Sequence, residues 1–292
     1  MAAHSAAAVS ILFIGNSFTF AQGSPVRFYR PDSVTDLNGQ GVGGVPALFK
    51  SFSSQAGLSY DVYLEAESGV SIDWHLEHKL GVIDQRAWDV AVLQGYSTLD
   101  IEKPGDPAAL MRAVQRMAAV LRARNPAIDL RLMATWSRAD QTFEPKGAWY
   151  GKPIEAMAHD VRVGYDLVAK STPGVKSVVP VGEAWTRAMQ TGVADANPYD
   201  GIDAGKVDLW TYDNYHASTY GYYLEALVVF GSITLRDPRS LGETECSGFE
   251  LGLSRAQIAA LQQVAFDQLS AEGAVRAAQK PAAAAAPARC AR

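Results

Sequence analysis

A serine, a histidine and an aspartate stand where they could carry out nucleophilic catalysis. Ser17 closely follows a short apolar run, residues 10–14, whereas Asp213 and His216 lie three residues apart, just before another apolar stretch. A serine hydroxyl is a poor nucleophile until a base removes its proton. Histidine is the usual base, and it works best when a carboxylate holds its other ring nitrogen. The three residue types are therefore those of a Ser-His-Asp triad.

The elements that must position these residues follow from hydrophobic periodicity. Short apolar runs rich in β-formers alternate with longer segments of helical period. The predicted strands are residues 10–14, 60–65, 88–94, 130–135 and 175–181. The predicted helices are residues 45–56, 72–80, 107–124, 153–170, 183–190, 218–231 and 254–269. This alternation predicts a three-layer α/β/α sandwich with a mainly parallel sheet and right-handed crossovers.

The sequence contains one such series and no internal repeat, which favours one domain. We expect this domain to span residues 9–272, followed by an Ala/Pro-rich, flexible tail at 273–292. In open parallel sheets the ligand site lies at the carboxyl ends of the strands. Ser17 and Gly69 follow predicted strands, Gln94 ends one, and the loop 213–216 comes late in the chain. We therefore expect them to meet at that edge.

These segments resemble, in order, the conserved blocks of the SGNH (GDSL-type) hydrolase family. Residues 11–19, Ile-Leu-Phe-Ile-Gly-Asn-Ser-Phe-Thr, resemble its nucleophile block in a Gly-Asn-Ser version. Residues 67–71 resemble the second block, and residues 213–226 closely resemble the last one. The resemblance implies the flavodoxin-like fold of that family and a serine esterase that needs no cofactor and no metal. Ser17 would be the nucleophile, His216 the base and Asp213 the residue that orients it.

The third block departs from the family pattern. It usually reads Gly-x-Asn, whereas this chain has Gln94-Gly95-Tyr96-Ser97. The Gln-Gly pair looks like that of carbohydrate acetylesterase branches, where a glutamine side chain donates to the oxyanion. The resemblance thus implies an oxyanion hole made of the Ser17 and Gly69 backbone N–H groups and the Gln94 amide. Ser97 is the weaker alternative to Gln94.

The Gln-Gly pair favours O-acetyl groups on a carbohydrate as the substrate, either a small molecule or a polysaccharide. Four residues are candidates for binding it: Asn16, Trp74, Tyr96 and Tyr215. The irregular segment 21–44, with Arg27 and Arg30, is expected to shape substrate choice. Two alternatives stay open, namely a lipase or thioesterase for longer acyl chains and a non-catalytic carbohydrate-binding relative.

Residues 39–44, Gly-Gln-Gly-Val-Gly-Gly, match a dinucleotide-binding fingerprint before a predicted helix. The fingerprint requires a strand just before it, and residues 33–38 are polar and turn-like. We therefore expect a flexible covering loop instead of a nucleotide site.

His75 and His78 could share one helix face and hold a metal ion. Zinc needs at least three protein ligands, and no third candidate is nearby. We expect surface or groove-lining histidines and no metal.

Composition limits the classes of function. The chain has 292 residues, 48% of them hydrophobic, and a net charge of −5. No basic cluster suits nucleic acid, and no apolar run approaches the ~18 residues of a membrane span. The sequence does not indicate an oligomeric state.

The N-terminal residues and the two cysteines bear on cellular location and redox state. The first eight residues do not form a complete signal peptide, but they could follow one that has been removed. A secreted or periplasmic location is therefore expected, with a cytoplasmic one as the alternative. Cys246 and Cys290 could form a disulfide or stay as two unrelated thiols.

Overall fold

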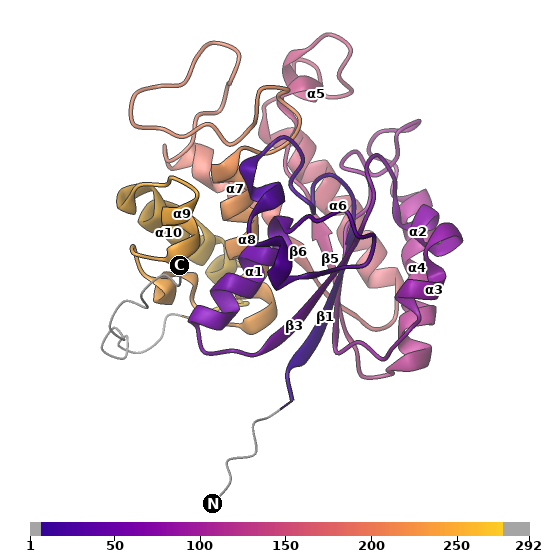
Figure 1. The fold of residues 1–292 in the computed structure, drawn as a ribbon. Helices are drawn as coiled ribbons and strands as arrows, with labels where there is room; N and C mark the ends of the chain where they lie inside the picture. Colours follow the sequence, from indigo (N-terminus) through magenta and orange to yellow (C-terminus); the bar gives the residue numbers. More distant parts are fainter. Residues whose placement is uncertain (1–6, 277–292) are drawn as a thin grey trace, which may run out of the picture.

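The computed structural model describes residues 7–276, and its centre is a parallel sheet (Figure 1). The strands are β1 (Val9–Gly15), β2 (Thr35–Asp36), β3 (Tyr60–Ala66), β4 (Val90–Leu93), β5 (Asp129–Ala134) and β6 (Val175–Pro180). They lie in the order β2-β3-β1-β4-β5-β6, and every neighbouring pair is parallel. The strands β2 and β3 lie on one side of β1, and the later strands β4 to β6 lie on its other side, so the order in which strands are added switches sides at β1. In doubly wound sheets ligands bind at such a switch point.

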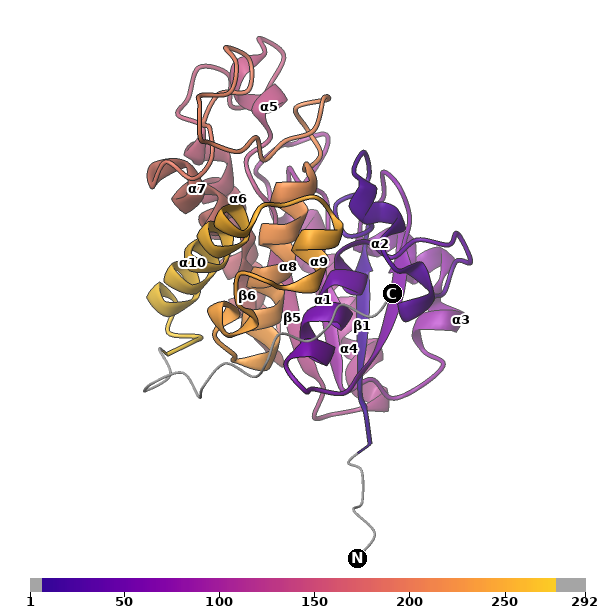
Figure 2. The same cartoon turned by 60° about the vertical axis from the view of Figure 1, so that its left-hand side comes forward.

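The helices cover both faces of the sheet (Figures 1 and 2). The longer ones are α1 (Gly44–Gln55), α2 (Ile72–His78), α4 (Ala108–Arg124), α6 (Glu155–Ser171), α7 (Val181–Gln190), α8 (Thr219–Thr234) and α10 (Arg255–Ala271). The shorter ones are α3 (Leu80–Ile83), α5 (Ala139–Phe143), α9 (Cys246–Glu250) and the 3₁₀ turns η1 (Pro25–Phe28), η2 (Pro31–Ser33) and η3 (Pro238–Leu241). The predicted three-layer α/β/α fold is confirmed.

Strand β1 shows why the sheet needs helices on both faces. Ile11 and Phe13 point into the core shared with α1, α7 and α8, whereas Leu12 and Ile14 point into the core shared with α2, α4 and α6. All four side chains are fully buried. A continuous apolar run, instead of an alternating one, is what a central parallel strand requires.

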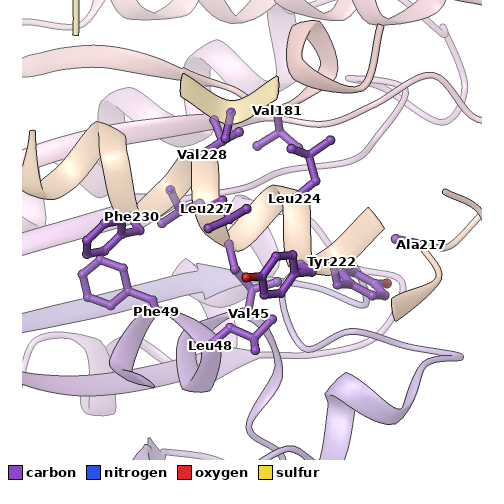
Figure 3. Close-up of a cluster of buried hydrophobic side chains, with 14 of the residues drawn as sticks. Val45, Leu48, Phe49, Val181, Ala217, Tyr222, Leu224, Leu227, Val228 and Phe230 are labelled. Carbon is purple, nitrogen blue, oxygen red and sulfur yellow. The ribbon is translucent and has the colours of Figure 1, made fainter. Parts of the chain in front are cut away.

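Helix α8 crosses the middle of the first of these cores (Figure 3). Residues Gly221–Ile233 are all buried, and the helix packs most extensively on α1 and α10. A helix that is apolar all round must be covered on every side. The Asp213–His216 loop comes just before α8, so this packing fixes where the loop stands.

The structure differs from the predicted elements in the segment after Ser17. The short strand β2 pairs with the edge strand β3, through Thr35 with Tyr63 and Asp36 with Leu64. Its residues are polar because β2 is an edge strand and is not buried on both faces. The turns η1 and η2 also lie in this segment, so much of it has regular structure.

Three further observations concern the chain as a whole. Within residues 7–276, no helix is both long and apolar enough to cross a bilayer. Val275 is buried and Ala274 packs against the core, so these two residues of the predicted tail contact the domain, and the tail after residue 276 lies outside the described residues. Cys246 opens α9, but Cys290 lies outside the described residues, and their bridge stays a prediction.

Candidate active site

Ser17 lies in a tight turn at the carboxyl end of β1. The Asn16 carbonyl accepts the backbone N–H groups of Thr19 and Phe20, and the Ser17 carbonyl accepts that of Gln22. A Cβ atom on Gly15 would lie only 2.1 Å from Thr19 Oγ1, so no side chain fits there. The glycine therefore lets the chain turn sharply as the strand ends.

The side chain of Gln94, the residue that follows β4, supports this turn. Its Oε1 accepts the Asn16 backbone N–H at 3.0 Å and the Thr19 hydroxyl at 2.9 Å. The Asn16 N–H can only donate, so the oxygen and not the nitrogen of the amide must face it. Gln94 Nε2 donates one hydrogen to the Gly95 carbonyl, which leaves its second N–H for an oxyanion. The role of Gln94 as an oxyanion donor stays a prediction.

Asn16 links three loops at the carboxyl edge of the sheet. Its Nδ2 donates to the carbonyls of Val70 at 2.9 Å and Gly95 at 3.1 Å. Its Oδ1 accepts the Phe18 N–H. Both amide hydrogens are engaged, so the contribution of Asn16 in this structure is to hold the turn, and substrate binding by it stays a prediction.

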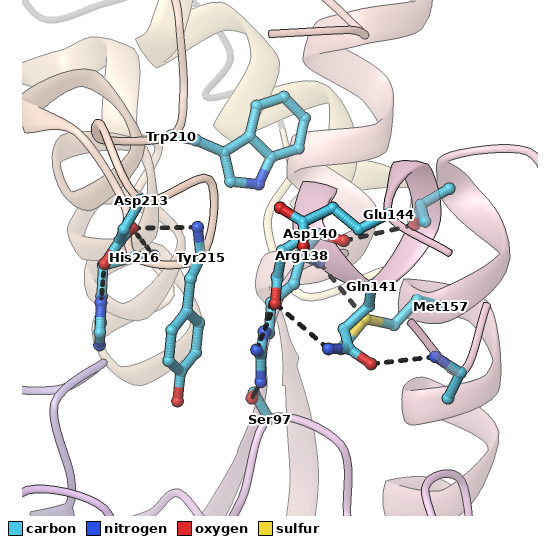
Figure 4. A network of polar contacts seen from close by, with 12 residues as sticks. Ser97, Arg138, Asp140, Gln141, Glu144, Met157, Trp210, Asp213, Tyr215 and His216 are labelled. Atoms are coloured by element: carbon cyan, nitrogen blue, oxygen red, sulfur yellow. Dashed lines mark hydrogen bonds and ion pairs between the residues drawn. The ribbon is translucent and has the colours of Figure 1, made fainter. Parts of the chain in front are cut away.

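Asp213 and His216 form a compact unit in the loop before α8. Asp213 Oδ1 accepts the backbone N–H groups of Tyr215 at 3.0 Å and His216 at 2.8 Å, and Oδ2 lies 2.7 Å from His216 Nδ1 (Figure 4). Asn214 has φ of 53°, a left-handed conformation that asparagine tolerates and that makes the turn tight. The Asp-x-x-His spacing thus brings the carboxylate directly onto the ring.

The electrostatics suit a histidine base. Burial raises the pKa of Asp213, but hydrogen bonds from the His216 ring and from two backbone N–H groups outweigh burial and leave the pKa below its usual value. Asp213 is thus a carboxylate that accepts Nδ1–H, and in a neutral ring this tautomer leaves Nε2 able to take a proton. Nε2 is buried and has no hydrogen-bond partner among the described residues.

The structure brings Ser17 and His216 to the same edge. The Phe18 ring centroid lies 5.6 Å from that of His216, and the Tyr222 hydroxyl of α8 donates to the Ser17 carbonyl at 3.3 Å. In residues 7–276, no hydrogen bond joins Ser17 Oγ to His216 Nε2. Such bonds are often long in enzymes without substrate and shorten when it binds.

The two predicted backbone donors are available. In the described part of the chain, neither the Ser17 N–H nor the Gly69 N–H donates to another protein group. Gly69 has φ of 72° and a Cβ there would meet nothing within 4 Å, so the conformation and not crowding favours glycine. Their role in binding an oxyanion stays a prediction.

Arg138 lies beside the candidate site and was not among the residues predicted from the sequence. Its guanidinium carbon lies 3.6 Å from the Tyr215 ring centroid, and Tyr215 stacks on His216 at 4.1 Å. Figure 4 shows the three side chains next to one another. Arg138 also pairs with both carboxylate oxygens of Asp140. Its position just after the strand at 130–135 is the signal that could have found it.

The two other aromatic candidates are partly exposed. Trp74 stacks on His78, with centroids 4.6 Å apart and an angle of 18° between the rings. Burial, and then the nearby Asp73 carboxylate, raises the pKa of Tyr96. Both side chains are only half-buried, and substrate binding by them and by Tyr215 stays a prediction.

The expectation for His75 was wrong. The side chain is fully buried, with Nδ1 at 2.9 Å from Glu65 Oε1 and Nε2 at 2.8 Å from the Gly15 carbonyl. His75 follows Ile72 by three residues and precedes Leu76, so it lies on the buried face of α2. His78 is exposed, as expected.

The glycine-rich segment 39–44 follows strand β2, so the expectation that no strand precedes it was also wrong. The geometry nevertheless leaves little room for a phosphate. The Val45 N–H at the start of α1 donates to the Thr19 carbonyl, and a Cβ on Gly44 would lie 2.7 Å from the Thr19–Phe20 backbone. The amino end of α1 is covered by the nucleophile turn.

The two arginines of the 21–44 segment contact protein groups. Arg30 forms an ion pair with Glu250 of α9 at 2.6 Å. The Arg27 guanidinium lies over the Phe20 ring and bonds to Gln22. The segment is thus anchored to the domain, and its influence on substrate choice stays a prediction.

No protein-family model and no curated protein matches this sequence. Among solved structures, a DUF4886 family protein from Bacteroides uniformis superposes with a TM-score of 0.63 at 16% identity, over 92% of this chain and 98% of that one. A protein from Slackia heliotrinireducens that has been assigned to the SGNH hydrolases gives 0.52 at 19% identity, over 78% and 100%. The chain has the SGNH hydrolase fold.

A third similar structure shares this fold. The family 3 carbohydrate esterase of Clostridium thermocellum gives a TM-score of 0.50 at 16% identity, over 80% of this chain and 99% of that one. In this SGNH hydrolase fold, β1 carries Ser17 and the loop before α8 carries Asp213 and His216. At these identities, the similarity establishes the fold and leaves the chemistry to be argued from the site.

Proposed function

We propose that the protein is a serine carboxylic-ester hydrolase, with O-acetyl groups on a carbohydrate as its substrates. The observation that carries the proposal is the Asp213–His216 pair, with Nδ1 bound at 2.7 Å and Nε2 buried without a partner among the described residues. The nucleophile turn at the same edge of the sheet, with Ser17 in it, supports it.

In the proposed reaction, Ser17 Oγ attacks the ester carbonyl carbon while His216 Nε2 takes the hydroxyl proton. The carbonyl oxygen becomes an oxyanion, which accepts hydrogen bonds from the Ser17 and Gly69 N–H groups and from Gln94. The tetrahedral intermediate then collapses, and His216 gives its proton to the leaving alcohol. Water, deprotonated by His216, hydrolyses the acyl-serine and releases acetate.

The carbohydrate preference rests on the Gln94-Gly95 pair and on the partly exposed aromatic rings of Trp74, Tyr96 and Tyr215. Aromatic faces suit the apolar faces of sugar rings. The family 3 carbohydrate esterase with the same fold is in keeping with this choice. A polysaccharide substrate would also agree with a secreted or periplasmic location.

The test is hydrolysis of p-nitrophenyl acetate, butyrate and octanoate and of acetylated polysaccharides. We expect the highest kcat/KM on acetate and release of acetate from at least one polysaccharide. Ser17→Ala should lower kcat by about four orders of magnitude or more without changing the circular dichroism spectrum. Full activity in Ser17→Ala would refute the mechanism.

Two results would support the alternatives. A rate that rises from acetate to octanoate would indicate a lipase or thioesterase. Sugar binding without labelling of Ser17 by a fluorophosphonate would indicate a non-catalytic relative.

A further inference from the structure

A buried acid–histidine pair that the proposed mechanism does not use lies under the nucleophile turn. Glu65 is the next-to-last residue of β3 and pairs in register with Ile14, and His75 reaches it from α2. Both side chains are completely buried. Nδ1 of His75 faces Glu65 Oε1 at 2.9 Å, and Nε2 faces the Gly15 carbonyl at 2.8 Å.

The partners determine where one proton lies. A carbonyl oxygen can only accept a hydrogen bond, so His75 Nε2 must carry a hydrogen. A second proton lies between Nδ1 and Glu65, on one or the other, since an acceptor facing an acceptor would be repulsive. The pair therefore presents a fixed donor to Gly15.

The Gly15 carbonyl, which also accepts the Glu67 backbone N–H at 3.3 Å, belongs to the peptide group that joins Gly15 to Asn16, directly before Ser17. The other side of that same peptide group, the Asn16 N–H, donates to Gln94 Oε1 at 3.0 Å. Two buried side chains therefore hold its C=O and its N–H, one from α2 and the other from Gln94, the residue after β4. The plane of a peptide is rigid, so holding both sides fixes the direction in which the chain enters the turn.

We propose that the buried Glu65–His75 pair, together with Gln94, clamps the Gly15–Asn16 peptide and so positions Ser17 for attack. This rests on the proposed esterase function. His75 and Glu65 are positioning residues, since they reach Ser17 only through the backbone. A pair this deeply buried is a poor device for stability alone, because similar apolar residues often stabilise a protein as much or more.

The test compares variants that keep or remove the donor to Gly15. In Glu65→Gln, the amide can donate to Nδ1 and leave Nε2–H on the Gly15 carbonyl. In the double variant Glu65→Met, His75→Phe, apolar side chains of similar size fill the space, so the side-chain donor is lost and only the Glu67 backbone N–H remains on the Gly15 carbonyl. His159→Gln, an exposed histidine of α6, is the matched control.

We expect kcat on p-nitrophenyl acetate to fall about 10- to 100-fold in the double variant with KM unchanged, at a temperature where circular dichroism shows it folded. Glu65→Gln should keep kcat at least tenfold above that of the double variant, and His159→Gln should match the wild type. Wild-type kcat in the double variant, or equal losses in it and in Glu65→Gln, would overturn the clamp.

Hydrogen exchange provides a second measurement that does not need activity. The Asn16 amide should exchange at least tenfold faster in the double variant than in the wild type, while amides in α10 stay unchanged. Unchanged Asn16 protection would refute the clamp even if the wild type hydrolysed no ester. An inactive wild type with faster Asn16 exchange would instead refute the proposed function alone.

Discussion

At the scale of single residues, Asp213 uses its two oxygens for two different tasks. Oδ1 holds the backbone of the turn through the N–H groups of Tyr215 and His216, and Oδ2 accepts Nδ1–H of His216. One side chain therefore both shapes the loop and sets the tautomer of the proposed base.

Asp213→Asn separates these tasks. The amide oxygen can still accept the backbone N–H groups, but the amide nitrogen would face Nδ1 and favour the tautomer that carries its hydrogen on Nε2. We expect kcat to fall about 10⁴-fold with the fold retained, as measured on p-nitrophenyl acetate. Asp237→Asn, which changes another carboxylate that accepts a backbone N–H, should leave kcat unchanged. An active Asp213→Asn would argue against His216 as the base.

At the scale of elements, the start of α8 couples stability to the site. Ser218 caps the helix, since its Oγ accepts the N–H groups of Tyr220 at 3.1 Å and Gly221 at 3.3 Å. Ser218 also donates to the Asp208 carbonyl at 2.6 Å. The cap lies two residues after His216, so it holds the loop to the helix.

Ser218→Ala should lower the free energy of unfolding by about 0.5–2 kcal/mol through loss of the cap. It should also lower kcat about tenfold, because the loop that carries His216 loses its anchor. Ser254→Ala removes the N-cap of α10, and the loop before that helix carries none of the proposed catalytic residues, so this variant should cost similar stability with kcat unchanged. Urea unfolding and ester hydrolysis measure the two effects. Equal kcat in both variants would contradict the proposed coupling.

At the scale of the whole molecule, Glu225 is an acid in the middle of the core. It lies in α8, is completely buried, and neither carboxyl oxygen has a hydrogen-bond partner in residues 7–276. Burial therefore raises its pKa well above the usual value. The Glu225 carboxyl binds its proton more tightly in the folded state than in the unfolded state. The stabilisation from protonated Glu225 is therefore fully present below the unfolded pKa, and it is lost as the pH rises toward the folded pKa.

The contribution of Glu225 to the free energy of unfolding should thus fall by about 1.4 kcal/mol for each pH unit above the unfolded pKa of about 4.3, until the folded pKa is reached. Glu225→Gln removes the titration. We expect it to unfold at a higher urea concentration than the wild type at pH 7 and at a similar one at pH 4. Glu77→Gln, an exposed position of α2, is the control. Parallel pH profiles for Glu225→Gln and the wild type would contradict a raised pKa.

The element types and their order were predictable because side-chain periodicity is a local property. The run at 10–14 indicated a strand buried on both faces, and the periodic segment at 218–231 indicated a buried helix; both are confirmed. The edge strand β2 was missed, because a two-residue polar strand has no periodicity and forms only by pairing with β3.

The sequence by itself determined the chemistry available: a serine after a strand, and an aspartate three residues before a histidine. The spacing of these residues in the chain already places Asp213 next to His216. What only the tertiary structure decided is which distant groups support them. His75 under Gly15, Gln94 on Asn16 and Arg138 on Tyr215 each join residues far apart in the chain. Local patterns cannot specify such contacts, because they depend on how the helices pack against the two faces of the sheet.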